Sequence, residues 1–137
     1  MFALDTNALI VWQKQHPVFV RHYEEALRRG ELIAIPALVR FEARRELANP
    51  LYQRRLARLD GLIAGHPTLD LDARAVDIAV SLHDVLRADG NLIDDADLLI
   101  AATVLRHDAV LVTNNTSHFE RIPNLERVDW QQENPNP

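Results

Sequence analysis

Short apolar runs alternate along the chain with longer stretches in which apolar residues recur at helical spacing. The short runs predict strands at residues 2–4, 32–35, 68–71, 109–112 and 125–130. The longer stretches predict helices at residues 8–15, 17–29, 37–48, 51–64, 73–88 and 94–105, with a helical turn at 117–121. Short strands that alternate with helices indicate an α/β fold, in which a mainly parallel sheet of about five strands has helices on both faces.

The apolar positions also predict which helix faces are buried. Residues 98–105 are almost wholly apolar, so we expect this helix to be buried on most sides. In the helix at 73–88, we place Val76 and Val85 on the inner face with their neighbours. In the helix at 37–48, Phe41 shares one side with other apolar residues and is expected to face inward.

Length and composition indicate one ordinary globular domain. The chain has 137 residues, which predicts a single domain at residues 1–130 followed by a polar tail at 131–137. The sequence has no cysteine, which excludes a disulfide scaffold and thiolate metal sites. No apolar run approaches the length of a membrane helix and no signal peptide is visible, so we expect a cytoplasmic protein without membrane contact.

The charge is distributed unevenly. The net charge of −5 argues against a protein that coats nucleic acid by charge alone. Residues 1–68 carry ten basic and seven acidic side chains, whereas residues 69–137 carry five basic and thirteen acidic ones. Six arginines lie within residues 40–58. They are either solvated helix faces or contacts for phosphate, with which arginine pairs in a bidentate way.

Carboxylates follow the predicted strands. Asp5 ends the first strand, Asp95 and Asp97 open the apolar helix, and Glu42 lies early in the helix after the second strand. Alone, Asp5 would be a helix cap, and the other acids would complement a helix dipole or lie on the surface. In a parallel sheet, however, all four can meet at the edge formed by the strands' carboxyl ends. Converging carboxylates need a cation, and oxygen ligands favour Mg²⁺ or Mn²⁺.

Several segments, taken in order, resemble the PIN-domain ribonucleases and, more narrowly, the VapC-type toxins of bacterial toxin–antitoxin pairs. The matching segments run from one end of the chain to the other: Leu4-Asp-Thr-Asn7, Glu42, Asp97-Leu-Leu-Ile-Ala-Ala102, Val112-Thr-Asn-Asn115, His118-Phe-Glu-Arg-Ile-Pro123 and Val128-Asp-Trp130. The resemblance implies a three-layer α/β/α sandwich. It also implies a metal-dependent endoribonuclease that acts as a toxin, with Mg²⁺ as the expected cofactor and Mn²⁺ as an alternative.

The resemblance also assigns roles to residues of the chain. Asp5, Glu42 and Asp97 match the acidic residues of the family, and Asp95 matches an auxiliary acid; these four are the expected catalytic and metal-binding residues. Asn115 stands where many members have a fourth acid. Asp94 departs from the family pattern, which often has glycine there. Thr6, Thr113 and Asn115 are expected to lie around the metal-binding acids and to hold them in place.

The partners that the resemblance implies are an RNA substrate, a cognate VapB-type antitoxin and a second copy of the chain in a homodimer. We expect arginines of the 40–58 segment to contact the RNA backbone outside the acidic centre. The apolar residues Val11, Trp12 and Phe41 are either core residues, which we favour, or part of the surface that receives the antitoxin.

Other interpretations of the same residues stay open. The carboxylates alone also fit a metal-dependent DNA nuclease or phosphatase on the same scaffold. A phosphoaccepting receiver domain would need a lysine after its last strand, and the only lysine is Lys14. The Asn at position 115 keeps open a catalytically decayed module that only binds RNA or a partner. The six histidines show no zinc-ligand spacing, and we expect His118, beside the Thr-Asn-Asn turn, to be a surface or loop residue.

Overall fold

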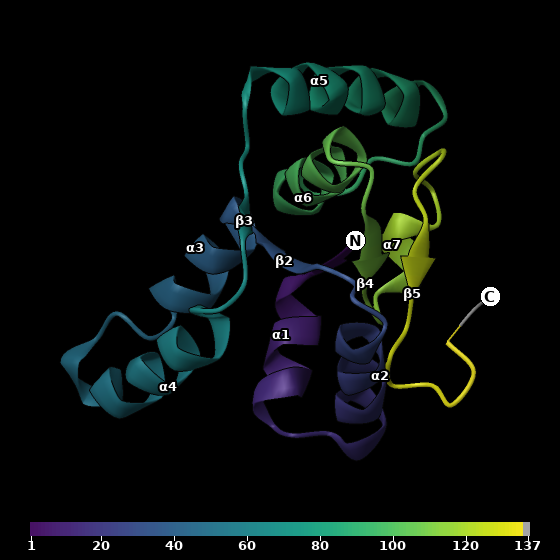
Figure 1. Cartoon of the computed structure of the whole chain (residues 1–137). Coiled ribbons are helices and arrows are strands. Elements are labelled where there is room, and N and C mark those ends of the chain that lie inside the picture. Colours follow the sequence, from purple (N-terminus) through teal and green to yellow (C-terminus); the bar gives the residue numbers. More distant parts are fainter. Residues whose placement is uncertain (136–137) are drawn as a thin grey trace.

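The centre of the molecule is a sheet of five parallel strands in the order β3-β2-β1-β4-β5 (Figure 1). The structure is a computed structural model and describes residues 1–135. The strands are β1 (Phe2–Leu4), β2 (Ile33–Pro36), β3 (Thr68–Leu69), β4 (Val110–Val112) and β5 (Arg127–Val128). The predicted α/β fold with a parallel sheet of about five strands is confirmed.

Helices cover both faces of the sheet. They are α1 (Thr6–Gln13), α2 (Pro17–Arg28), α3 (Ala37–Arg45), the 3₁₀ turn η1 (Pro50–Tyr52), α4 (Gln53–Ile63), α5 (Ala73–Ala88), α6 (Asp95–Arg106) and α7 (Thr116–Phe119). Figure 1 shows α1 and α2 on one side of the sheet and α5 and α6 on the other, whereas α3 and α4 form a pair that extends from its edge. This arrangement is the predicted three-layer sandwich.

The central strand β1 brings distant parts of the sequence together. It pairs with β2 on one side and with β4 on the other, with Leu4 opposite Val112. Beyond this register, the backbone N–H of Asp5 donates to the carbonyl of Val112 at 3.1 Å. Because all strands run in the same direction, the loops that follow β1, β2 and β4 leave the same edge of the sheet. That edge carries the predicted site residues.

Helix α6 is the buried helix that the sequence predicts. Its side chains Leu98, Ile100, Ala101, Ala102, Thr103 and Val104 are all buried. The hydroxyl of Thr103 donates to the carbonyl of Leu99 at 2.8 Å, so the buried polar atom has a partner. Asp94 begins the helix as its N-cap. A rigid, buried helix therefore positions Asp97 at its first turn.

Three predicted inward positions are wrong. Phe41 on α3 is 56% exposed, and Val76 and Val85 on α5 are 43% and 46% exposed. Helix α5 buries Ala75, Ala79, Leu82 and Leu86, a narrower stripe than its apolar residues suggest. Helix α5 packs mainly against α6, and Val76 and Val85 line depressions beside that contact, so the two valines lie at the margin of the core.

The C-terminal segment folds back toward α2. The backbone carbonyl of Gln132 accepts a hydrogen bond from His22 Nε2 at 2.8 Å, and Arg21 forms an ion pair with Glu133. The boundary expected after residue 130 stays a prediction, and residues 136 and 137 of the expected tail lie outside the described residues. No helix in the described part of the chain is long and apolar enough to cross a membrane.

Candidate active site

Asp5 is a buried carboxylate at the end of β1. Its Oδ1 accepts the backbone N–H of Ala8 at 2.7 Å, and the hydroxyl of Thr113 donates to the same carboxylate. The residue is 4% exposed. Burial raises the pKa of Asp5 from 3.8 to about 6, the charges of Asp97 and Glu42 add to the rise, and the two hydrogen bonds oppose it. Asp5 is thus both the cap of α1 and an acid facing the strand edge.

Glu42 approaches Asp5 from the second turn of α3. The hydroxyl of Thr6 donates to its Oε1 at 2.7 Å, which joins the start of α1 to α3. Arg45 lies one turn further along α3, with its Nη2 3.9 Å from Glu42 Oε2. The side chain of Glu42 is 19% exposed. This mostly buried acid is therefore held by one hydrogen bond from α1 and by one more distant cation.

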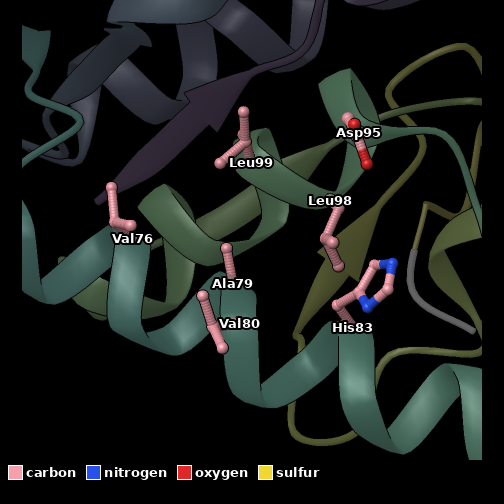
Figure 2. Close-up of a pocket in the computed structure, with 7 residues that line it drawn as sticks. All are labelled: Val76, Ala79, Val80, His83, Asp95, Leu98 and Leu99. Atoms are coloured by element: carbon pink, nitrogen blue, oxygen red, sulfur yellow. The ribbon is translucent and has the colours of Figure 1, made fainter.

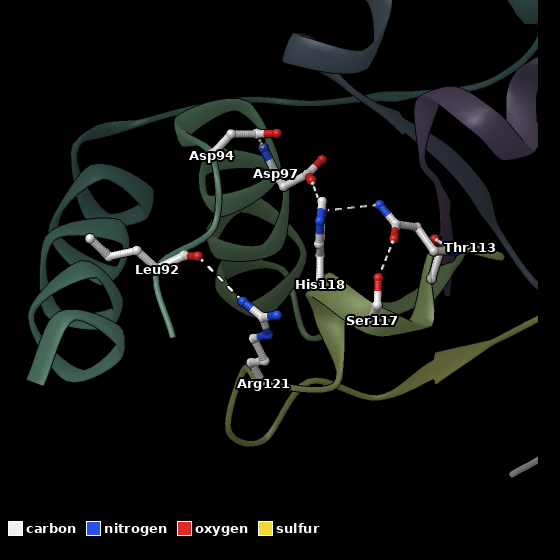
Figure 3. Close-up of polar contacts among 8 residues, drawn as sticks. Leu92, Asp94, Asp97, Thr113, Ser117, His118 and Arg121 are labelled. Carbon is white, nitrogen blue, oxygen red and sulfur yellow. Dashed lines mark hydrogen bonds and ion pairs between the residues drawn. The ribbon is translucent and has the colours of Figure 1, made fainter. Parts of the chain in front are cut away.

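Asp97 completes the acidic group from the first turn of α6. Its backbone N–H donates to Asp94 Oδ1 at 2.9 Å, and His118 Nδ1 donates to its Oδ2 at 2.8 Å (Figure 3). Asn115 Nδ2 lies 3.2 Å from the same ring nitrogen. Burial raises the pKa of Asp97, as do the charges of Asp94 and Glu42, whereas the hydrogen bond from His118 lowers it.

His118 is the site residue that the sequence reasoning missed. Its side chain is 41% exposed, in agreement with the expected surface position, but its ring on α7 also contacts Asp97. The Thr-Asn-Asn turn explains its position, because the backbone N–H of Asn115 donates to Thr113 Oγ1 at 2.9 Å and turns the chain back toward α6. Its place three residues after Asn115 was the available signal, since a short helix brings residues three apart onto one side.

The three acids open into one small polar pocket of about 170 Å³. It is lined by Asp5, Thr6, Asn7, Glu42, Asp97, Ile100 and Asn115. Besides His118, the only cationic side chain within 4.0 Å of these carboxylates in residues 1–135 is Arg45. Three converging carboxylates with so little countercharge repel one another, and their oxygens are the donors that a hard divalent cation prefers. The residues present therefore fit a divalent metal ion.

A second arrangement overlaps with this pocket. In the described part of the chain, one group of three side chains has ligand atoms within 4.8 Å of one another, and it consists of Asp94, Asp97 and His118. The acids of the pocket are spaced more widely. Wider spacing suits Mg²⁺, which keeps several water ligands, whereas a tighter group with an imidazole suits a transition metal such as Fe²⁺ or Zn²⁺ better. Asp97 belongs to both arrangements.

Asp95 lies elsewhere. It lines an apolar groove between α5 and α6, with His83 and Val80 on the opposite wall (Figure 2). Successive residues of an α-helix are about 100° apart around its axis, so Asp95 and Asp97 point in nearly opposite directions. The structure brings Asp5, Glu42 and Asp97 together, with Thr6, Thr113 and Asn115 beside them, and it does not bring Asp95 into their pocket.

Comparison with known proteins identifies the family to which the chain belongs. The profile of the PIN domain family matches residues 2–125. The chain belongs to the PIN domain family. Ribonuclease VapC2 of Rickettsia felis is 30% identical over 131 residues, covering 95% of this chain and 98% of the relative. The tRNA(fMet)-specific endonuclease VapC of Shigella flexneri is 31% identical over 130 residues, covering 94% and 97% of the two chains.

Complexes named VapBC are also found among the solved structures that resemble this chain. This PIN-domain chain superposes with a TM-score of 0.85 on a chain of the VapBC2 complex of Rickettsia felis bound to a promoter DNA fragment, at 29% identity, and the match covers 94% of this chain and 98% of the other. The near-complete coverage in both directions places the chain with VapC-type PIN proteins, as its sequence motifs indicate.

Proposed function

We propose that this chain is a metal-dependent endoribonuclease and the toxin of a VapBC-type toxin–antitoxin pair. The observation that carries the proposal is the pocket in which Asp5, Glu42 and Asp97, from three separate parts of the sequence, converge with little countercharge. The relatives that span the whole chain are named ribonucleases or endonucleases. A buried acidic pocket in such a chain supports hydrolysis of an RNA phosphodiester.

Mg²⁺ is the cofactor that we propose, with Mn²⁺ as the alternative. Asp5 and Asp97 would hold the ion, directly or through water, and Glu42 would complete the site. When bound, such an ion polarises a phosphate oxygen and lowers the pKa of a coordinated water. The donor set supports this assignment, because all three side chains offer oxygen, and burial together with the neighbouring acids raises the pKa of Asp5 and of Asp97.

The remaining site residues hold these carboxylates in place. Thr6 fixes Glu42, Thr113 fixes Asp5, and His118 fixes Asp97, each through one hydrogen bond to the carboxylate. Groups of this kind orient metal ligands and keep their lone pairs directed into the site. Asn115 presents an amide where a charged ligand would add further repulsion, so we assign it a role in positioning His118.

The test is cleavage of total cellular RNA by the purified, antitoxin-free protein with Mg²⁺, with Mn²⁺ and with EDTA. We expect discrete fragments that require metal, and Asp97→Asn should reduce the rate about a thousandfold or more because metal catalysis contributes several kcal/mol. Asp70→Asn, at an exposed position, is the matched control. Intact RNA in every lane from folded protein would overturn the proposal in favour of the decayed, binding-only module.

Asp95 has its own test, because it lines the other groove. The resemblance predicts an auxiliary role in catalysis, whereas its position predicts that Asp95→Asn keeps cleavage within a few-fold of the wild-type rate. The rate of this variant beside that of Asp97→Asn separates the two. A loss as large as that of Asp97→Asn would assign Asp95 to the metal site despite its position.

We propose three partners: an RNA substrate, a VapB-type antitoxin and a second copy of the chain. Titles of solved relatives name VapBC complexes, which supports the antitoxin, while the homodimer is carried by the family resemblance alone. A cellular RNA substrate supports a cytoplasmic location, which stays part of the proposal. Sedimentation of the free chain and of the chain co-expressed with its antitoxin measures both associations.

A further inference from the structure

A second depression adjoins the acidic pocket. It is a groove of about 370 Å³ between α1, α3 and α4, and Figure 1 shows the α3–α4 pair beside α1. Its lining includes the acids Glu42 and Glu46 and the cations Lys14, Arg55 and Arg58. Thr6 and Glu42 line both the groove and the acidic pocket. A chain-like ligand could therefore occupy both depressions at once.

The groove carries three exposed cations. Lys14 lies at the end of α1, and Arg55 and Arg58 lie one turn apart on α4. In residues 1–135, no carboxylate lies within 4.0 Å of any of the three charged groups. The guanidinium of Arg55 stacks over the ring of Tyr52 at 5.6 Å, which holds it at the groove without neutralising it.

Three other arginines of this region already have partners. Arg44 pairs with Asp60, and Arg40 donates to the hydroxyl of Thr68. Arg45 lies within 4.0 Å of both acids that line the groove, Glu42 and Glu46. The acids of the groove are thus partly neutralised by Arg45, and the three remaining cations give it an excess of positive charge beside a strongly negative pocket.

We propose that Lys14, Arg55 and Arg58 bind the sugar–phosphate backbone of the RNA strand on one side of the bond that is cleaved. This inference rests on the proposed ribonuclease function. An acidic pocket alone repels a polyanion, so a substrate with one charge per nucleotide needs cations next to the pocket. The groove supplies them where the strand leaves the carboxylates. Lys14, the chain's only lysine, thereby gains a role, and Arg40, Arg44 and Arg45 are not needed for it.

The test measures RNA binding separately from cleavage. The probe is a fluorescent, mixed-sequence single-stranded oligoribonucleotide, titrated in EDTA at several salt concentrations. The variant carries Lys14→Gln, Arg55→Gln and Arg58→Gln. We expect its affinity at low salt to fall about tenfold to a hundredfold, and the slope of log K against log salt to decrease by about 2, since three single-strand phosphate contacts are lost.

The matched control changes three exposed arginines away from the groove, Arg28→Gln, Arg74→Gln and Arg87→Gln, and so removes the same charge. In this variant, the slope of log K against log salt should differ from the wild-type slope by less than the change expected for one phosphate contact, about 0.7. With metal present, the groove variant should show a raised KM and a kcat within a few-fold of wild type, as expected for residues that bind substrate away from the reacting atoms.

Three results would overturn the proposal. They are a wild-type slope in the groove variant, an equal loss in the control variant, and no RNA binding by the wild-type protein at low salt. Unchanged RNA affinity with weakened binding of the antitoxin would assign the groove to a protein partner instead. If the groove variant loses RNA affinity but the wild-type protein cleaves no RNA, RNA binding by the groove is supported and the proposed ribonuclease function is contradicted.

Discussion

At the scale of single residues, Asp5 links stability to function. Its raised pKa means that the native state binds this proton more tightly than the unfolded chain does. The group has no effect on the free energy of unfolding below pH 3.8, and its destabilisation grows as pH rises and is complete above about pH 6. A difference of about two pKa units corresponds to roughly 3 kcal/mol.

Asp5→Asn should therefore stabilise the metal-free protein by about 3 kcal/mol at pH 7.5 and by almost nothing at pH 3.5. Asparagine keeps the cap of α1, because its oxygen can accept the same N–H of Ala8. Urea unfolding in EDTA at the two pH values measures the effect. Equal free energies of unfolding for variant and wild type at pH 7.5 would contradict the prediction that the buried charge of Asp5 destabilises the native state.

His118 gives a prediction about metal affinity. His118→Ala removes the hydrogen bond to Asp97, which then loses its fixed orientation. Removing a residue that orients a metal ligand typically lowers metal affinity or activity by about tenfold to a hundredfold. We expect the Mg²⁺ concentration for half-maximal cleavage to rise by that factor, with His83→Ala, in the groove between α5 and α6, as control. A half-maximal concentration equal to that of the control would leave His118 without a role in positioning.

The sequence predicted three of the acids and the two threonines that bind them, but not the contact of His118 with Asp97. Asp5, Glu42 and Asp97 are each marked by an adjoining strand or helix start, and the parallel sheet then brings them to one edge. The position of His118 depends on a turn after β4, whose hydrogen bond between Thr113 and Asn115 leaves no apolar pattern. The expected grouping of Asp95 with Asp97 conflicts with helix geometry, which separates them by about 200°.

At the scale of elements, Asp72 joins α5 to α6. Its Oδ1 accepts the N–H of Ala75 at 2.9 Å and so caps α5, while its Oδ2 lies 3.2 Å from Arg106 Nε on α6. The hydrogen bond from Ala75 and the charge of Arg106 hold the pKa of Asp72 below its ordinary value. Its stabilising effect is therefore present above about pH 4 and is lost as the pH falls through the lowered pKa.

Asp72→Ala should lower the melting temperature by a few degrees at pH 7, because α5 loses its cap and its link to α6. Asp72→Asn keeps an oxygen for the cap and should lose less. Thermal unfolding of both variants at pH 7 and pH 3 measures this, and the gap between Asp72→Ala and wild type should narrow at pH 3. An undiminished gap at pH 3 would contradict the assigned role of the carboxylate charge.

Helix positions were predictable, whereas the width of their buried faces was not. The spacing of apolar residues and the cap at Asp72 gave α5 as residues 73–88, as observed. The same spacing placed Val76 and Val85 inward, because a helical period gives the direction of the apolar side but not how far the neighbouring layer extends over it. Phe41 fails for the same reason on α3, which lies at the edge of the sheet.

At the scale of the whole molecule, the proposed metal site predicts that folding stability depends on divalent cations. A ligand that binds only the native state adds RT ln(1 + [L]/Kd) to the free energy of unfolding, about 2.7 kcal/mol at a hundred times Kd. We expect Mg²⁺ to raise the melting temperature of the wild-type protein accordingly. Scans with Mg²⁺ or EDTA, for wild type and Asp5→Asn, measure it. A shift of equal size in Asp5→Asn would indicate ion binding outside the pocket.

The position of β1 in the middle of the sheet also determines at which stage of its synthesis the chain can assemble the acidic pocket. Its two neighbouring strands are contributed by residues 33–36 and 110–112, and the pocket needs Asp97 and the turn at Thr113 as well as Asp5. A chain still being synthesised therefore carries Asp5 from the start but has no assembled carboxylate site until nearly all of its residues have left the ribosome. A ribonuclease built in this order cannot cleave RNA while most of its own chain is still being translated.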